Sequence, residues 1–229
     1  MKKGLIALIG IMLIGAFAIA PGQGVIYEED FEASDGGYTH SGTNDEWEWG
    51  HPTSGPGAAH SGNNCWATDL DGNYANQGWG SNYLYSVGIN IPSGVAAVRL
   101  SFWHWMYKEY YWDRCGLYIS PDNSSWTRIA WWQWTYGNRR WEQYTYRLPD
   151  SYIGGTLYIR WRLQTDYSVT YPGWYIDDVT VESPYPTPEI DVAKILSPPG
   201  EPVAVIEGIG VIYKFLPIIV PIGDRVTIK

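Results

Sequence analysis

Short runs of alternating apolar and polar residues dominate the chain between residues 25 and 183. A period of two is typical of a β-strand with one buried face. Two runs show the alternation most clearly, and their apolar positions are Leu100, Phe102, His104 and Met106 in one and Leu157, Ile159, Trp161 and Leu163 in the other. Shorter strands are expected at 24–31, 64–68, 83–87, 116–120, 127–132, 142–148 and 175–181.

Turn-forming residues separate these runs, as in Asp71-Gly72-Asn73 and Tyr136-Gly137-Asn138. Strands at this spacing, several with large side chains on both faces, favour two packed sheets. We therefore predict an all-β, two-sheet antiparallel jelly-roll sandwich over residues 25–183. That topology brings the first and last strands together in one sheet.

The first twenty residues form a separate segment. Lys2 and Lys3 precede an apolar run, and small residues follow at Ala16, Ala18 and Ala20. This pattern is typical of an export signal over residues 1–20, cleaved after Ala18 because Pro21 hinders cleavage after Ala20. The run is also nearly long enough for an uncleaved membrane anchor. A secreted, extracellular or cell-surface location is expected, with membrane contact only if the segment is uncleaved.

The composition changes again after the predicted sandwich. Residues 184–190 are rich in proline and read as a stiff linker. Residues 191–229 are apolar, but Pro217 and Pro221 interrupt them and β-branched residues are frequent, which argues against a spanning helix. About forty residues is too few for a standard immunoglobulin-like module. We expect a strand-rich tail or part of a second domain.

The chain is acidic, with 24 Asp and Glu against 15 Lys and Arg and a formal net charge of -9. Nucleic acids and anionic membranes require a basic surface. No run of basic residues is longer than Arg139-Arg140. The composition therefore excludes nucleic acid as a partner.

Acidic residues lie inside apolar, strand-like runs at both ends of the predicted sandwich. Asp30 and Glu32 come near its start, and Asp177 and Asp178 near its end. Terminal strands that meet would bring these carboxylates together, and Ca²⁺ prefers such oxygen ligands. We predict a structural calcium ion that joins the two ends of the sandwich.

The chain has two cysteines, Cys65 and Cys115. In an exported protein they allow one disulfide, which would stabilise the fold by roughly 4 kcal/mol for a loop of about fifty residues. Two buried free thiols are the alternative, and the sequence leaves both open.

Aromatic usage is biased, with 14 Trp and 19 Tyr against 4 Phe. Trp and Tyr combine an apolar face with a polar tip, which suits sugar rings and protein interfaces. Any single Trp can equally belong to the core. We predict a ligand-binding sheet face composed of Trp103, Trp105, Tyr107, Tyr158, Arg160 and Arg162. A second cluster is expected where a loop with Trp131, Trp132 and Trp134 lies beside Tyr110, Tyr111 and Trp112.

Catalytic motifs are missing from the sequence. It contains neither His-Glu-x-x-His nor Gly-x-Ser-x-Gly, and its four histidines are not spaced for a helical zinc site. Glu109, Asp113 and Asp166 are candidate carboxylates, but their spacing does not pair them. We expect no enzymatic activity.

An ordered series of short motifs resembles a known domain family. It includes Trp49-Gly50-His51-Pro52, Cys65-Trp66-Ala67-Thr68-Asp69, Tyr118-Ile119-Ser120-Pro121-Asp122 and Gly173-Trp174-Tyr175-Ile176-Asp177-Asp178. They resemble the MAM-like jelly-roll domains, which are concanavalin A-like or carbohydrate-binding-module-like sandwiches. Such domains accompany secreted immune inhibitor A-type metallopeptidases and many bacterial and archaeal surface proteins. The resemblance covers nearly all of residues 25–183. The start of the tail is similar to immunoglobulin-like repeats, which implies a truncated or degenerate repeat.

The resemblance implies roles for individual residues. Glu32 and Asp178 correspond to calcium carboxylates, Asp30 and Asp177 to nearby helpers, and Asn64 to the end of a loop that adds oxygens. The expected function is a secreted, non-catalytic, calcium-stabilised module that recognises glycans or cell-surface proteins. One alternative is an accessory domain or fragment of a larger secreted hydrolase, peptidase or surface protein. Another is a spacer in a surface layer.

Overall fold

The computed structural model describes residues 24–184, 204–206 and 210–212. The predicted signal segment 1–20, almost all of the linker and most of the tail lie outside these residues. The chain divides into two compact units, Met1–Pro184 and Tyr185–Lys229. In the second unit, β13 (Ala204–Ile206) pairs antiparallel with β14 (Gly210–Ile212).

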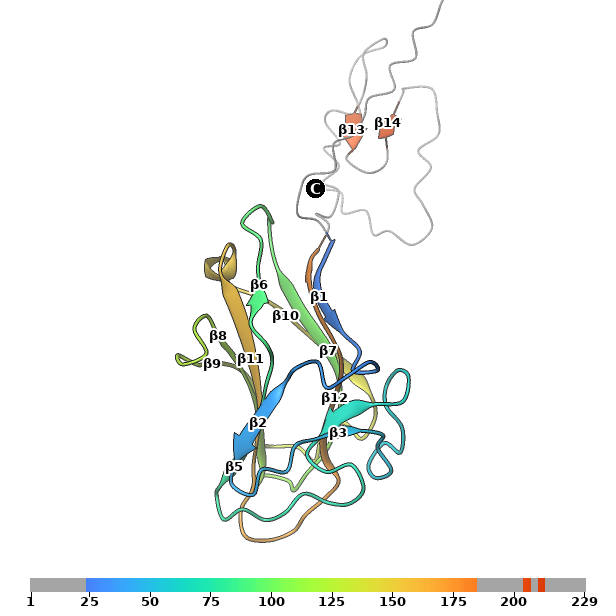
Figure 1. Ribbon diagram of the computed structural model, residues 1–229, viewed down its shortest axis with the longest axis vertical. Helices are drawn as coiled ribbons and strands as arrows, with labels where there is room; N and C mark the ends of the chain where they lie inside the picture. Colours follow the sequence, from blue (N-terminus) through green and yellow to red (C-terminus); the bar gives the residue numbers. More distant parts are fainter. Residues whose placement is uncertain (1–23, 185–203, 207–209, 213–229) are drawn as a thin grey trace, which may run out of the picture. The chain divides into compact units, whose positions relative to one another are not determined.

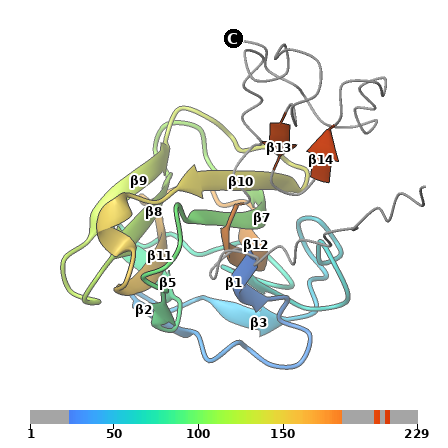
Figure 2. The same cartoon turned by 90° about the horizontal axis from the view of Figure 1, so that it is seen from above.

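Two six-stranded antiparallel sheets form the first unit (Figures 1 and 2). The first sheet has the order β10-β7-β12-β4-β3, with β1 also paired to β12. Its strands are β1 (Gly24–Glu29), β3 (Glu48–Gly50), β4 (Cys65–Ala67), β7 (Arg99–Tyr107), β10 (Glu142–Arg147) and β12 (Gly173–Ser183).

The second sheet has the order β2-β5-β11-β8-β9, with β6 also paired to β11. Its strands are β2 (Thr39–Gly42), β5 (Ser81–Tyr85), β6 (Ile89–Asn90), β8 (Arg114–Ser120), β9 (Thr127–Trp132) and β11 (Thr156–Gln164). A short 3₁₀ turn, η1 (Asp150–Tyr152), precedes β11. No helix within the described ranges is long and apolar enough to span a membrane.

The core lies between the sheets and follows the alternation in the sequence. On β11, Leu157, Ile159, Trp161 and Leu163 are fully buried, and the residues between them point outward. The first strand also meets the last, because Gly24 lies opposite Ser183 in the β1–β12 ladder. The predicted all-β, two-sheet sandwich with adjoining terminal strands is confirmed.

A β-bulge interrupts β12 where it carries its acidic pair. The register with β7 shifts between Asp177 and Thr180, and Asp178 has a φ of 46°. Ile176 and Val179 on either side both belong to the core. In a bulge two residues of one strand oppose a single residue of its partner, so the inward positions shift by one residue, from Trp174 and Ile176 before the bulge to Val179 and Val181 after it. The bulge therefore places both carboxylates off the core, on the outer side of the first sheet.

Candidate functional site

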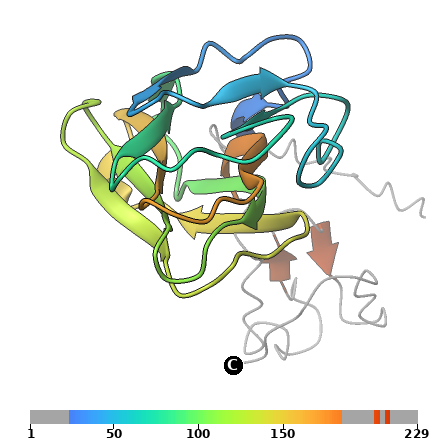
Figure 3. The same ribbon diagram turned by 90° about the horizontal axis from the view of Figure 1, so that it is seen from below.

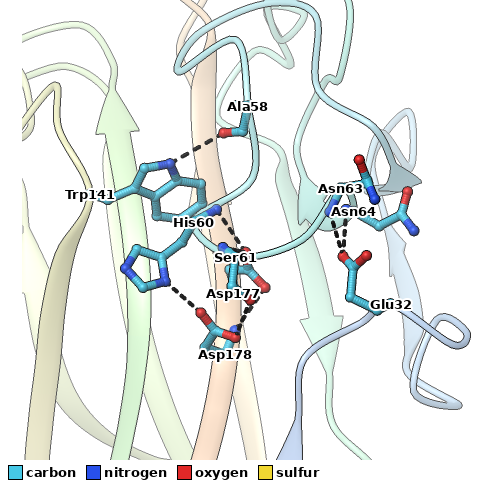
Figure 4. Close-up of polar contacts among 9 residues, drawn as sticks. All are labelled: Glu32, Ala58, His60, Ser61, Asn63, Asn64, Trp141, Asp177 and Asp178. Carbon is cyan, nitrogen blue, oxygen red and sulfur yellow. Dashed lines mark hydrogen bonds and ion pairs between the residues drawn. The ribbon is translucent and has the colours of Figure 1, made fainter.

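Loop 58–64 crosses the outer side of the first sheet and is tied to the bulge of β12 (Figure 4). The backbone N–H of His60 donates to Asp177 Oδ2 at 2.8 Å, and that of Ser61 donates to the same oxygen at 3.2 Å. Asp178 Oδ1 accepts from Ser61 Oγ at 2.8 Å, and its Oδ2 lies 2.5 Å from His60 Nδ1. The two carboxylates thus fix the middle of the loop.

Glu32, just after β1, holds the far end of the same loop. Its Oε1 accepts from the backbone N–H of Asn63 at 2.8 Å and of Asn64 at 2.7 Å. Gly62 has a φ of 54°, and a Cβ there would lie 2.2 Å from Glu32 Cδ. Only glycine fits this position without strain. We call Glu32, Asp177, Asp178 and residues 60–64 the carboxylate joint.

The carboxylate joint brings the carboxylates of Glu32, Asp177 and Asp178 together at a partly buried site. Asp177 is fully buried. Burial and the neighbouring Asp178 carboxylate raise the pKa of Asp177 to about 7. Of the charged side chains hydrogen-bonded in the joint, His60 alone can carry positive charge.

The predicted calcium ligands gather only in part. Carboxylate and amide oxygens suit a hard cation, and Glu32, Asp177, Asp178 and Asn64 all belong to the joint. The carboxylates, however, already accept hydrogen bonds from the loop. Asp30 is exposed and accepts the backbone N–H of Glu32 at 3.1 Å. Calcium binding at the joint stays a prediction.

The predicted face of six aromatic and arginine residues does not form as one surface. Trp103, Trp105 and Tyr107 lie on β7 of the first sheet, and Tyr158, Arg160 and Arg162 lie on β11 of the second. The alternation shows which residues of a strand point outward, but it does not show which sheet the strand joins.

The β7 half of that predicted face is also covered. Trp103 stacks on His60 with ring centres 3.8 Å apart, and Trp105 is only 6% exposed and packs against Tyr175. Trp141 adds a hydrogen bond from its Nε1 to the carbonyl of Ala58 at 3.2 Å. Loop 58–64 therefore occupies the place that the prediction left for a ligand.

Four loops meet at the end of the sandwich where β12 begins, the lower end of Figure 1 that Figure 3 shows from below. They span residues 74–80, 108–113, 133–139 and 165–172. Backbone hydrogen bonds connect them, from Lys108 to Tyr136, from Tyr111 to Gln133 and from Gly78 to Asp166. We call this the loop end.

Large aromatic side chains are exposed at the loop end. They are Trp79, Tyr110, Trp112, Trp134, Tyr136 and Tyr167, with exposures from 37% to 74%, and we call them the aromatic rim. The expected neighbourhood of Trp134 and Tyr111 is confirmed by a ring distance of 4.4 Å. Trp131 and Trp132 lie on β9 instead. The sequence analysis missed Trp79, Tyr136 and Tyr167, although Trp79 and Tyr136 lie next to glycines in turns, which was a usable signal.

Five of the six rim side chains, all except Tyr167, pack against other aromatic rings. Tyr111 links Trp112 and Trp134, at ring distances of 4.9 and 4.4 Å. Trp112 also contacts Trp79 edge-on at 6.3 Å, and Tyr110 contacts Tyr136 at 5.3 Å. Rings that are already packed lose little side-chain entropy when a ligand binds.

Three carboxylates come together at the same end. One oxygen from each of Glu109, Asp113 and Asp166 lies within 4.8 Å of the others, the only such group of His, Cys, Asp or Glu in the described part of the chain. These are the candidates that sequence spacing could not pair. Loops 108–113 and 165–172 become neighbours because β8 pairs with β11 and β7 with β12.

The buried member of this trio, Asp113, is held in place by hydrogen bonds from neighbouring residues. Asp113 is fully buried and accepts hydrogen bonds from the Tyr74 hydroxyl and from the backbone N–H of Asp166, the latter at 3.0 Å. Burial raises its pKa to about 6. Beside it, buried Lys108 donates from Nζ to three backbone carbonyls, and burial lowers the pKa of this amine. Two carboxyls about 5 Å apart can hydrolyse glycosides, but both Asp113 oxygens are hydrogen-bonded and shielded from a substrate.

The two cysteines are free and buried, so of the two alternatives that the sequence leaves open, one disulfide or two buried free thiols, the free thiols hold. Cys65 lies on β4 of the first sheet and Cys115 on β8 of the second. Burial raises the pKa of Cys115 to about 12 and the pKa of Cys65 well above its usual range.

Comparison with known proteins gives one curated relative. The chain is similar to bacillopeptidase F of Bacillus subtilis (strain 168), with 34% identity over 169 residues. The similarity covers 68% of this chain and 10% of bacillopeptidase F, so the chain spans about a tenth of that relative. No protein-family model matches the chain.

Solved structures with a similar fold include carbohydrate-binding modules, adhesin domains and a glycoside hydrolase domain. The module TmCBM61 in complex with β-1,4-galactotriose has 18% identity, covers 67% of this chain and 94% of its own, and gives a TM-score of 0.45. The K1 cleaved adhesin domain of Lys-gingipain from Porphyromonas gingivalis W83 has 18% identity, coverages of 69% and 98%, and a TM-score of 0.47.

Proposed function

We propose that residues 24–184 form a non-catalytic binding module of an extracellular protein, and that the aromatic rim binds a glycan. The observation that carries this proposal is the rim itself, in which four loops expose six large aromatic side chains at one end of the sandwich. Large aromatic side chains exposed at the tips of loops indicate a binding site, because exposed apolar patches in soluble proteins commonly mark such sites.

The residue types of the rim favour sugars. Trp and Tyr present flat apolar faces to the C–H faces of a pyranose ring, while their N–H and O–H groups reach its hydroxyls. Partly exposed Glu109 adds a carboxylate acceptor beside the rim. The resemblance to MAM-like sandwiches and the predicted export signal support an extracellular role.

Calcium at the carboxylate joint is the second part of the proposal. Three carboxylates and one histidine leave an excess of negative charge, which a divalent cation would balance. Its role would be structural, because the joint fastens loop 58–64 to both terminal strands of the unit.

An accessory role in a longer chain is the second candidate function, and the similarity to a tenth of bacillopeptidase F supports it. The test is immunoblotting of secreted proteins from the source cells with an antibody against residues 24–184. A band well above 25.9 kDa, the mass of this chain, is expected. A band at or below that mass would argue against it.

Affinity electrophoresis tests the rim with galactan, xylan, mannan and β-1,3-glucan in the gel. We expect at least one of these polysaccharides to retard the parent protein. The double variant Trp112→Ala/Trp134→Ala should bind about tenfold more weakly or worse, since central aromatic side chains dominate such contacts. Trp49→Ala is the matched control, because Trp49 is exposed on β3 and lies outside the rim.

Two results would overturn the rim proposal. One is the absence of retardation by all four polysaccharides. The other is equal retardation of the parent and the double variant, with the melting temperature of each variant confirming that it is folded.

A further inference from the structure

The outer face of the second sheet carries interleaved arginine and aromatic side chains. On β11, Arg160 lies opposite Tyr118 of β8, and Arg162 lies opposite Tyr83 of β5. Arg128 and Trp131 of β9 extend the row across β8. We call Arg128, Arg160, Arg162, Tyr83, Tyr118 and Trp131 the arginine–aromatic face. Five of these six side chains are partly exposed and Arg128 is exposed, so the face is open.

Charge is separated between the sheets. None of the strands of the second sheet contains Asp or Glu, although the chain has 24 acidic residues. These strands carry four arginines, Arg114, Arg128, Arg160 and Arg162. No carboxylate among the described residues forms an ion pair with any of the four. Although the chain has a net charge of -9, the second sheet of the described unit therefore presents a positively charged face.

Aromatic rings hold these guanidinium groups in place. The Arg160 guanidinium carbon lies 4.5 Å from the ring centre of Tyr118 and 4.3 Å from that of Trp126, and Arg128 lies 4.6 Å from the ring of Trp131. Arg162 donates to the Tyr118 hydroxyl at 3.3 Å. Stacking fixes a planar guanidinium by its face and leaves its N–H edge for another partner.

Arg160 lacks such a partner within the described chain. Its side chain makes no hydrogen bond to a described residue, and its buried Nε has no acceptor there. An unsatisfied donor on a charged group costs more than a neutral one. The terminal N–H groups of this partly exposed guanidinium make no hydrogen bond to a described residue either, and a ligand acceptor would pair with them.

We infer that the arginine–aromatic face binds a carboxylate-bearing polysaccharide, a polyuronate. Guanidinium forks match carboxylates in two-point geometry, and the rings between them offer faces for the sugars that carry the carboxylates. An acidic peptide fits less well, because extended peptides bind through the open edge of a sheet, whereas this surface is a sheet face. The inference rests on the proposed glycan-binding function but uses none of the rim residues.

Affinity electrophoresis of the full chain in gels with polygalacturonate or alginate tests this inference. We expect retardation that weakens as salt is raised, in spite of the net negative charge of the protein. Arg162→Gln and Arg128→Gln should each weaken retardation about tenfold. Arg128 is exposed on the edge strand β9, so its replacement is the milder of the two for folding. Arg147→Gln, on β10 of the first sheet, removes the same charge and should leave retardation unchanged.

The other possible outcomes show whether the arginine–aromatic face, the rim or neither binds the polyuronate, and whether the face prefers acidic peptides. Absence of retardation, or equal retardation of the parent and both arginine variants, overturns the inference. Equal retardation by poly-glutamate assigns the face to acidic peptides and overturns the polysaccharide. If Trp112→Ala/Trp134→Ala loses polyuronate retardation, the ligand lies on the rim and not on this face. Failure of the neutral polysaccharides alone overturns only the rim proposal.

Discussion

His104 makes the stability of the sandwich depend on pH. It lies on β7, is 6% exposed, and accepts a hydrogen bond at Nδ1 from Trp174 Nε1 at 3.2 Å. Burial lowers its pKa from 6.5 to about 4, although the charge of Glu142 opposes the change. Protonation of Nδ1 would also remove the acceptor that Trp174 uses.

The sign follows from the two pKa values. Below 6.5 the unfolded chain binds a proton at His104, while the folded chain resists protonation down to about pH 4. Stability is therefore lost as the pH falls through this window. The full gap of about 2.5 corresponds to about 3.4 kcal/mol. Between about pH 7 and about pH 4.5 we expect His104 to account for about 2.4 kcal/mol of the loss.

Urea denaturation of the parent and of His104→Gln at these two pH values measures this contribution. The glutamine amide does not titrate, and its oxygen can still accept from Trp174. The parent should lose about 2.4 kcal/mol more than the variant on acidification. Carboxylates titrate in both proteins and cancel in the comparison. Equal losses, within about 0.5 kcal/mol, would refute the reasoning.

Three further predictions concern the joint and the thiols. Gly62→Ala should cost about 2 kcal/mol or more of unfolding free energy in urea, because its Cβ would meet Glu32, and Gly57→Ala should cost only about 1 kcal/mol, because that Cβ meets nothing within 4 Å. A loss of similar size in both would contradict the packing argument. EDTA should lower the melting temperature of the parent but not of Glu32→Gln, and melting that is insensitive to EDTA would remove the calcium proposal. Cys65 and Cys115 should react with a thiol reagent only in denaturant, since both are buried with raised pKa values, and fast reaction of the native protein would contradict this.

The strands and their buried faces could be predicted from the sequence because the alternation of apolar and polar residues along a strand is a local pattern. The β11 run alternates without interruption, and its predicted inner residues are all in the core. Pairing between distant strands is not local. The alternation predicts correctly that Trp103 and Arg160 point away from the core. Nothing in the sequence of either strand shows that the two strands belong to different sheets.

The sites were harder to predict for the same reason. Glu109 and Asp166 are far apart in sequence, and only the order of the strands brings their loops together. The bulge that turns both Asp177 and Asp178 outward depends on the register with β7, which no local pattern records. The choice between a disulfide and two free thiols was open for the same reason, because only the tertiary structure shows that Cys115 belongs to the core between the sheets and that Cys65 packs with Trp105 and Tyr175 in a separate cluster.

The pairing of β1 with β12 decides where the two ends of this unit lie. Gly24 and Ser183 lie opposite each other, so both points of attachment are on one side of the unit. β12 runs for 11 residues from the loop end to that side, a distance of about 35 Å. Residues 24 and 184 therefore lie at one pole of this unit, and the side chains of the aromatic rim project from the opposite pole.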